Sequence, residues 1–218
     1  MATVKGQSAP KQTRREKAEA TRVRMITAAH QVFVERGYGG TRMADIAQAA
    51  GVAVQTLYFT FHTKPELLQA CYDRAVLGAT EPAPPQLQPW YRQLMQAPSG
   101  PEALRHFVRG NTAICHRVAL LDEVARAAAH EPEALEVRMH SEQLRRDGYR
   151  DVIKHLAKTF GLRKGLTVEH ATDLLLLYGG GAVYRTMIVD YGWTEARFTS
   201  WLTDTLAIQL LAPQPVTR

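Results

Sequence analysis

The stretch DIAQAAGVAVQTLYFTFHTKPELL, residues 45–68, decides the fold of this chain. Its middle, residues 57–61, is rich in aromatic side chains and would suit a strand. Apolar residues nevertheless recur with helical spacing on both sides of that segment. The pattern predicts a short helix at 43–50, a break at Gly51 and a second short helix from about residue 53. Two short helices joined by a tight turn have the spacing of a helix-turn-helix.

The two predicted short helices divide their side chains between an inner and an outer surface. Ala47 lets the helices approach closely, and Gly51 supplies a turn conformation that a Cβ atom would disfavour. Leu57 and Phe61, four residues apart, face the core of the small domain. The outer surface is left with Gln55, Thr56, Tyr58 and Phe59. Glutamine can pair with an adenine edge and hydroxyl groups can bond to phosphates, so this surface suits a DNA major groove.

Charge favours DNA over the alternative of an ordinary helical hairpin with aromatic residues in its core. Residues 1–64 hold ten lysines or arginines and four acidic residues. Their net charge of +6 equals that of the whole chain, so the remaining residues carry no net charge. The first third therefore suits a polyanion partner, although a basic solubilising tail would give the same count. Lys64, at the start of the next helix, offers a charge and a backbone N–H to phosphate.

The rest of the chain has helical patterns, and the predicted fold class is all-α. No alternating strand pattern with hairpin turns and no internal repeat is present in the 218 residues. We divide the chain into a disordered basic tail (1–12), a three-helix helix-turn-helix domain (13–64), a connecting helix with a proline-rich linker (65–100) and a larger helical domain (101–218). The linker is predicted from its prolines and allows one helical turn near its end, at residues 90–95.

Several helix ends are marked by capping residues. Thr13 and Glu16 form a capping box that opens a helix ending at Gly37, which we expect in a left-handed conformation. Thr63 and Glu66 form a second capping box. Further helices are predicted near 102–116, 118–129, 133–160, 168–190 and 195–211, the last two after threonine N-caps at 167 and 194.

Composition also predicts where the protein works. No stretch of 18 or more apolar residues is present, so we expect no membrane span, and the polar N-terminus gives no secretory signal. Cys71 and Cys115 are the two cysteines, a number that fits a cytoplasmic protein with reduced thiols.

The stretch FVERGYGGTRMADIAQAAGVAVQTLYFTFHTKPELL, residues 33–68, resembles the DNA-binding domain of the TetR (tetracycline repressor-like) family. The matching positions are Gly37, Tyr38, Thr41, Asp45, Ile46, Ala47, Ala50, Gly51, Val52, Thr56, Leu57, Tyr58, Phe61, Lys64 and Leu67. Residues 183–202, VYRTMIVDYGWTEARFTSWL, are similar to the last two helices of one common C-terminal domain in the family.

The resemblance implies a ligand-responsive transcriptional repressor. Two subunits of a homodimer would each place a recognition helix, about residues 53–60, in one half-site of a palindromic operator of double-stranded DNA. A small-molecule effector in the domain at 101–218 would move the two helices apart and release the DNA. The family positions that contact DNA correspond to Thr41, Gln55, Thr56, Tyr58, Phe59 and Lys64.

Four positions depart from the family pattern. Arg42 stands where a serine or threonine usually caps the second helix, so either Thr41 caps it or Arg42 binds phosphate. Ala53 replaces the usual serine cap of the recognition helix, at a cost of about 1 kcal/mol. Val54 and Phe59 make the outer surface unusually apolar, which suits contacts with thymine methyl groups or sugars.

The last two helices predict the dimer interface, because they are apolar on too many sides for one core. An isologous four-helix bundle would cover the excess. The residues assigned to this interface are Val183, Met187, Phe198, Trp201, Leu202 and Thr205. For the ligand we assign Phe107, Asn111, His116, Tyr149, Tyr178 and Tyr184, on helices that would surround a pocket. The run Gly179-Gly180-Gly181 predicts a kink or a close approach of helices or ligand.

Three other functions compete with this interpretation. An enzyme is disfavoured, because the sequence contains no metal-ligand motif, glycine-rich phosphate loop or nucleophile–base pair, and we expect no cofactor and no metal. A thiol redox sensor would use Cys71 and Cys115, but both lie on apolar faces and inert buried thiols are expected. An architectural DNA-binding protein without a ligand is the third alternative.

Overall fold

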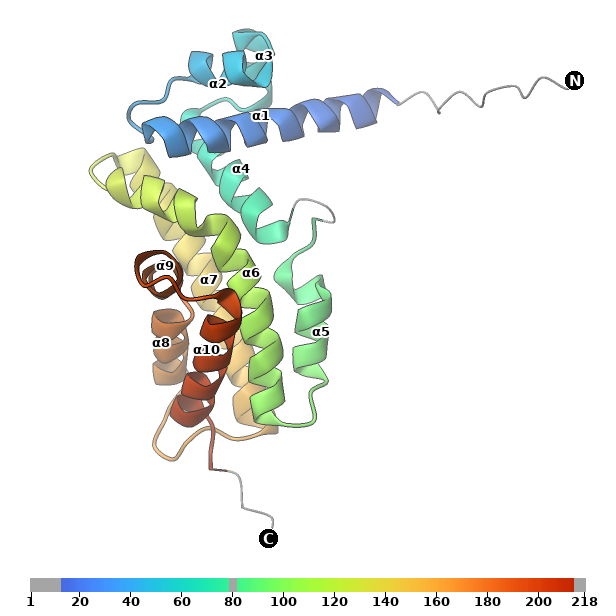
Figure 1. Cartoon of the computed structure of the whole chain (residues 1–218). Helices are drawn as coiled ribbons and strands as arrows, with labels where there is room; N and C mark the ends of the chain where they lie inside the picture. The colour runs from blue at the N-terminus through green and yellow to red at the C-terminus, as the bar shows by residue number, and fades with distance from the viewer. Residues whose placement is uncertain (1–12, 79–81, 214–218) are drawn as a thin grey trace, which may run out of the picture.

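The computed structural model describes residues 13–78 and 82–213, so the tail expected at 1–12 lies outside the described residues. The prediction of an all-α fold is confirmed. In the described ranges the only β-type pairing is an isolated antiparallel bridge between Leu162 and Leu211. A small group of helices sits at one end of a longer helical bundle (Figure 1).

The small group begins with α1 (Arg14–Arg36), α2 (Met43–Ala50) and α3 (Val54–Thr60). The capping box of Thr13 and Glu16 is present, and α2 has the predicted bounds. Gly37 ends α1 with φ 72° and ψ 171°, so its positive φ was expected but its ψ is not that of the left-handed helical region. Gly51, at φ 64° and ψ 41°, does adopt that conformation and turns the chain from α2 into α3.

Helix α4 (Lys64–Leu77) joins the small group to the bundle (Figure 1). Thr63 caps it by accepting a hydrogen bond from the backbone N–H of Glu66. The Glu66 carboxylate accepts from the backbone N–H of His62 and not of Thr63, so the second predicted capping box is only half formed. Buried residues of α1 to α4 make one core with the end of α6 and the start of α7, which ties the two groups of helices together.

Two long helices, α6 (Gly100–Ala127) and α7 (Pro132–Thr159), form the length of the bundle. The prediction of separate helices at 102–116 and 118–129 was wrong. No helix-breaking residue lies between them, and Arg117 uses its guanidinium to bond the carbonyl groups of Ala75 and Val76 at the end of α4. A short 3-10 turn (Pro85–Leu87) and α5 (Pro89–Met95) precede them, and α5 packs along α6.

Helices α8 (Val168–Tyr178), α9 (Gly181–Arg185) and α10 (Glu195–Leu210) cover the other side of α6 and α7 (Figure 1). Thr167 and Thr194 cap α8 and α10, as predicted. A single helix over 168–190 was wrong, because the chain breaks at the glycine run and continues through α9 into a wider π-helical segment, η2 (Thr186–Asp190). None of the helices in the described ranges is long and apolar enough to cross a bilayer.

Candidate nucleic-acid interface and ligand cavity

Helices α2 and α3 form the end of the molecule, which we call the tip. Arg42 occupies the N-cap of α2, and its backbone N–H donates to the Asp45 carboxylate at 3.1 Å. The Arg42 guanidinium bonds the same carboxylate, so Asp45 secures the start of the helix in place of a capping hydroxyl. Arg36 and Arg42 together lower the pKa of Asp45, chiefly through the Arg42 hydrogen bond. Ala53 starts α3 without a side-chain cap, as expected.

Helix α3 has one buried side and one open side. Leu57 and Phe61 are buried in the core of the small group, as predicted. On the other side Phe59 is 86% exposed, and Tyr58 and Val54 are 47% and 40% exposed. The described residues thus leave the Phe59 ring almost uncovered, although burying it would remove apolar area from water. The aromatic segment therefore serves both the core and an open surface.

The predicted DNA contacts fall into two groups. The residues open to solvent are Arg42, Gln55, Thr56, Tyr58 and Phe59. Thr41 is 2% exposed and its hydroxyl donates to the Gly37 carbonyl at 2.6 Å, so the expectation that this side chain contacts DNA is corrected. The Lys64 ammonium donates to the carbonyl of Tyr38 at 3.0 Å and lies 3.9 Å from the centre of its ring. Lys64 thus holds the turn between α1 and α2, a role that the sequence did not predict.

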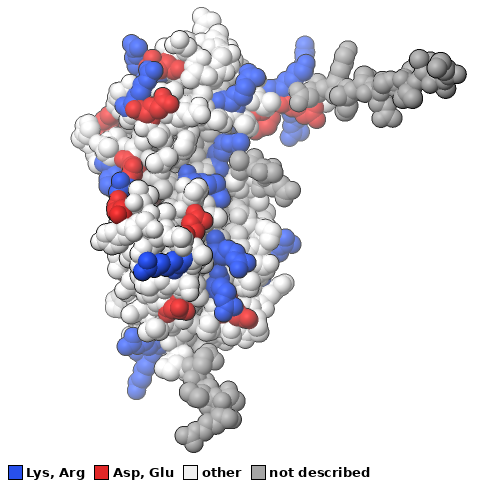
Figure 2. Space-filling model, in the orientation of Figure 1, with Lys and Arg blue, Asp and Glu red and all other residues white. Residues whose placement is uncertain are grey.

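Charge on the tip is sparse compared with the helix beneath it. Figure 2 shows basic and acidic side chains along α1 and a small group of both signs on the visible surface near α2, while α2 and α3 themselves hold one charged residue, Asp45. The exposed Arg42 is the cation at the start of α2, and its guanidinium forms an ion pair with Asp45. The tip is therefore suited to apolar and hydrogen-bonding contacts, with its positive charge supplied from the flanks.

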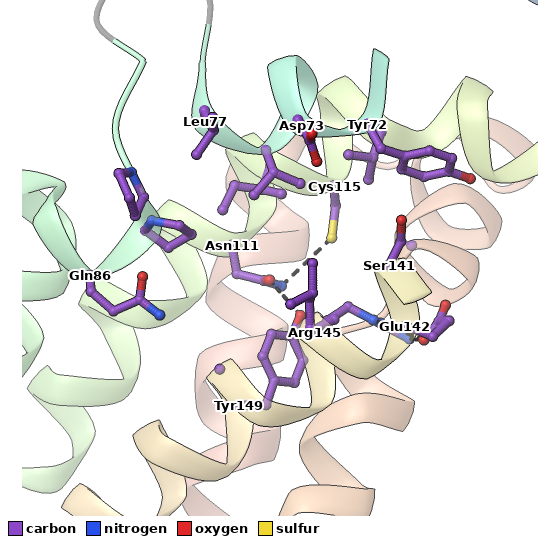
Figure 3. A pocket seen from close by; sticks show the side chains of 18 of the residues that line it. Tyr72, Asp73, Leu77, Gln86, Asn111, Cys115, Ser141, Glu142, Arg145 and Tyr149 are labelled. Atoms are coloured by element: carbon purple, nitrogen blue, oxygen red, sulfur yellow. Dashed lines mark hydrogen bonds and ion pairs between the residues drawn. The ribbon is translucent and has the colours of Figure 1, made fainter. Parts of the chain in front are cut away.

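A cavity of about 380 Å³ lies in the bundle between α4, α5, α6 and α7 (Figure 3). Tyr72 of α4, Trp90 and Tyr91 of α5 and Phe107 of α6 give it aromatic walls. Trp90 lies against Gly110, where a Cβ atom would overlap the indole ring. The segment treated as a linker in the sequence therefore contributes a wall of the cavity through α5. A cavity of this size can take a drug-sized molecule.

The inner wall of the cavity is a hydrogen-bonded cluster around the Gly179 carbonyl. Asn111 donates to that carbonyl at 2.8 Å, and the Tyr149 hydroxyl lies 3.0 Å from it and 2.5 Å from Asn111 Oδ1. The Cys115 thiol lies 3.5 Å from the same carbonyl. These contacts fix the break between α8 and α9. A Cβ atom at Gly179 would lie 2.8 Å from the Leu175 carbonyl oxygen and 3.4 Å from Asn111 Nδ2, so the position has little room for a side chain.

Three of the six predicted ligand residues line this cavity: Phe107, Asn111 and Tyr149. The other three, His116, Tyr178 and Tyr184, are not among its lining residues, which corrects their assignment. His116 and Tyr184 instead meet Glu195 on the far side of α6, with the Tyr184 hydroxyl 2.9 Å from both His116 Nδ1 and Glu195 Oε1. The aromatic rings of His116 and Tyr184 suggested that they would line a pocket. On α6 and α9, however, these two side chains lie outside the cavity lining.

Sequence reasoning missed most of the charged groups of the cavity. Arg145 is not among the predicted ligand residues, yet it lines the cavity and donates to Glu142 at 2.5 Å. Asp122 also lines the cavity and accepts a hydrogen bond from the Tyr72 hydroxyl at 3.1 Å. A signal existed on α6, because Phe107, Asn111, Cys115 and Val118 are spaced three or four apart and Asp122 continues that row.

The predicted dimer residues are partly used within the chain. Phe198 and Leu202 are 1% and 0% exposed and belong to the second core, so their assignment to the dimer interface is corrected. Val183, Met187, Trp201 and Thr205 are half-buried. Large apolar side chains that are more open on this side of the bundle are Leu177, Val189, Tyr191 and Ile208, which are 60–70% exposed. An apolar surface therefore remains on α8, η2 and α10.

These features define a helix-turn-helix protein that carries a helical domain with an internal cavity. A model described as bacterial regulatory proteins, tetR family, matches residues 25–71. This segment of the chain, from the middle of α1 to the middle of α4, is therefore similar in sequence to that family.

Two relatives are similar in sequence, and one solved structure is similar in fold. The chain is 44% identical over 59 residues to the HTH-type transcriptional regulator TtgR of Pseudomonas putida, which covers 27% of this chain and 28% of TtgR. It is 44% identical over 64 residues to the transcriptional repressor BepR of Brucella suis, covering 28% and 31%. NalD, a repressor of a multidrug efflux pump in Pseudomonas aeruginosa, has a similar fold, with a TM-score of 0.67, 18% identity and coverage of 90% and 98%.

The matched sequence spans less than a third of TtgR and BepR, and the likeness to NalD shows the fold alone. All three are named as regulators or repressors. Among the residues that the structure describes, no group of three or more histidine, cysteine or acidic side chains is arranged to hold a metal ion.

Proposed function

We propose that the protein is a transcriptional repressor that binds a palindromic operator as a homodimer and is released by a small molecule. The observation that carries the proposal is the open side of α3, where the side chains of Tyr58 and Phe59 are 47% and 86% exposed. In this proposal Gln55, Thr56, Tyr58 and Phe59 face the major groove and Arg42 binds a flanking phosphate. Residues 13–64 act as the DNA-binding domain, and residues 101–218 as the ligand-binding and dimerisation domain.

The homodimer is supported by the apolar surface of α8, η2 and α10. An isologous contact would bury Leu177 and Ile208 in both subunits at once, since a two-fold axis repeats every contact. We expect a dimer in sedimentation, and a monomer for Ile208→Asp, because a charge would be buried twice. Leu87→Asp is the matched control, since Leu87 is 67% exposed beside α5 on the opposite side of α6 and α7. A dimer that persists in Ile208→Asp would contradict this interface.

Release by a ligand is supported by the position of α4. Tyr72 and Leu77 of this helix line the cavity, while Lys64 at its other end holds the turn between α1 and α2. A second link runs from α7, because the Tyr38 hydroxyl donates to Glu133 at 3.3 Å. A molecule that displaces α4 from α6 would therefore move the tip, and in a dimer it would change the separation of the two α3 helices.

The proposed function is tested by footprinting the protein on DNA upstream of its own gene and then screening small molecules for release. One protected inverted repeat is expected, together with loss of the gel-shifted complex when a cavity ligand is added. Tyr58→Ala should weaken binding at fixed salt without unfolding the protein. Binding of all duplexes with equal affinity would favour an architectural protein and overturn the proposal, and so would unchanged affinity of Tyr58→Ala.

A further inference from the structure

The cavity is acidic although the chain carries a net charge of +6. Asp73, Asp122 and Glu142 lie in its lining, and Arg145 is the one cationic side chain among the described residues that line it. Three carboxylates against one guanidinium leave an excess of negative charge inside an aromatic chamber. Such a chamber attracts cations, because carboxylates and the faces of aromatic rings both stabilise positive charge.

The positive charge of Arg145 is already committed. Its Nε and one terminal nitrogen donate to the same Glu142 oxygen at 3.2 and 2.5 Å. Its guanidinium also lies 5.7 Å from the centre of the Tyr149 ring. A side chain held in this way neutralises Glu142, so Asp122 keeps its own charge.

Asp122 has little compensation of its own. Among the described residues its carboxylate accepts one hydrogen bond, from the Tyr72 hydroxyl, and forms no ion pair within 4.0 Å. A carboxylate can accept about four hydrogen bonds. Burial raises the pKa of Asp122 and the nearby Glu142 raises it further, while the Tyr72 hydrogen bond and the more distant charges of Arg145 and Arg126 act in the opposite direction. On one side the backbone of α9 closes over the group, since a Cβ atom at Gly181 would lie 2.7 Å from Asp122 Oδ2. The cavity is what faces its remaining acceptor positions.

Two further features complete the surroundings of a bound cation. The Ser141 hydroxyl lies in the cavity lining, is buried, and has no hydrogen-bond partner among the described residues. It can accept a hydrogen bond from an ammonium group. At the other end, Phe107 meets Trp90 and Tyr149 edge to face, with ring centres 6.3 and 5.2 Å apart. The lining positions on α6 from Phe107 to Asp122 cover about 22 Å of helix, which suits an elongated molecule.

We propose that the effector is an elongated lipophilic amine, with its ammonium group at Asp122 and Ser141 and its apolar body against Phe107 and Trp90. This inference rests on the proposed function, in which the cavity is the effector site. An acid of the same shape is disfavoured, because its carboxylate would meet Asp122 and Glu142 while Arg145 is already paired.

Three compounds with one body and different head groups test the charge. Isothermal titration of the full-length protein at pH 7.5 compares 6-phenylhexylamine, 6-phenylhexan-1-ol and 6-phenylhexanoate. The amine should bind about 10- to 100-fold more tightly than the alcohol, since a charge-assisted hydrogen bond replaces a neutral one. The acid should bind most weakly. Equal or tighter binding of the alcohol or the acid would overturn the inference and leave the ligand cavity in place. No binding of any of the three would remove the cavity as the effector site of the proposed function.

Variants then assign the preference to one carboxylate. Asp122→Asn should bring the amine down to the affinity of the alcohol and leave the alcohol unchanged. Asp73→Asn is the matched control, because Asp73 also lines the cavity but is exposed and accepts from Gln69, so the preference should stay within about twofold. Tyr72→Phe removes the hydrogen bond to Asp122 and keeps its charge, so the amine should still be preferred. An amine preference that survives Asp122→Asn would overturn the proposal, and the wild-type comparison remains decisive if that variant fails to fold.

Discussion

The tip and the cavity arrange apolar side chains in opposite ways. At the tip, Phe59 is pushed into solvent at 86% exposure although it belongs to a seven-residue helix with a well-packed inner side. In the cavity, Phe107 is 1% exposed but faces a space that the chain leaves unfilled. Each arrangement forgoes apolar contacts that folding alone would favour. In the proposed function each of them is a surface for a partner, a DNA groove outside and a small molecule inside.

The two regions also differ in how they are assembled. The side chains of the tip come from one stretch of about twenty residues, where a single helix sets which of them are exposed. The lining of the cavity comes from helices that are far apart in the sequence, from Gln69 on α4 to Gly181 on α9. A local motif can therefore predict the first region, whereas the second exists only after the bundle has folded.

The largest expected effect separates the two sides of α3. Leu57→Ala should lower the free energy of unfolding by about 2–5 kcal/mol, because Leu57 is fully buried and its loss leaves a cavity. Phe59→Ala should change it by less than about 0.5 kcal/mol but weaken operator binding about 10-fold. Urea unfolding and gel-shift titration at fixed salt measure the two quantities. A large loss of stability in Phe59→Ala would show that its ring is packed and not presented.

The second contrast concerns the two basic residues near the tip. Lys64→Met should cost about 1–3 kcal/mol of stability, because the carbonyl groups of Tyr38 and Thr41 lose their donor. Arg42→Gln should have little effect on stability but should reduce the slope of log K against log salt by about 0.9, as expected for one phosphate contact. The opposite pattern, with the slope changed by Lys64→Met alone, would restore Lys64 to the DNA contacts.

How much the sequence predicted follows the same division. The bounds of α2, the buried pair Leu57 and Phe61, and the capping threonines at 13, 167 and 194 were all predicted, because each depends on neighbours within a few residues. The continuity of α6 was missed, since an arginine at 117 gives no sign that it will cap another helix. The exposure of Phe59 could be predicted from helical spacing. The burial of Thr41 could not, because its hydroxyl bonds the carbonyl groups of Val32 in α1 and of Gly37 at the end of that helix.

The ligand residues show why the rest could not be predicted. Phe107, Asn111 and Tyr149 were chosen as aromatic or polar residues on core helices, and so were His116, Tyr178 and Tyr184. Only the relative rotation of α6, α7 and α9 decides which of them face the cavity, and helix periodicity fixes a buried side without naming its partner. Two of the six predicted dimer residues were misplaced for the same reason, because buried Phe198 and Leu202 share the apolar character of α10 with exposed Ile208.

Two glycines sharpen the account of the cavity, with effects of opposite sign. Gly110→Ala places a Cβ atom inside the Trp90 ring, so α5 must shift. We expect a net loss of about 1 kcal/mol of stability after the gain in helix propensity, together with weaker ligand binding. Gly148 lines the cavity, and an added Cβ atom would meet nothing within 4 Å. Gly148→Ala should therefore raise the free energy of unfolding by up to about 1 kcal/mol. Thermal unfolding distinguishes them, and stabilisation by Gly110→Ala would mean that Trp90 does not rest on α6.

The smallest expected effect concerns the two thiols, one in each region. Cys71 lies in the core beneath the tip and Cys115 in the wall of the cavity, and both are buried. Burial raises the pKa of each thiol to about 12, so the reactive thiolate is scarce near neutral pH. Mild hydrogen peroxide should therefore leave operator binding unchanged, and iodoacetamide should label the native protein far more slowly than the unfolded protein. Loss of the gel-shifted complex on oxidation, prevented in the Cys71→Ser, Cys115→Ser double variant, would instead establish a redox sensor. Protection of Cys115 alone by a cavity ligand would place that ligand against α6, because Cys115 lines the cavity and Cys71 is not among the described residues that line it.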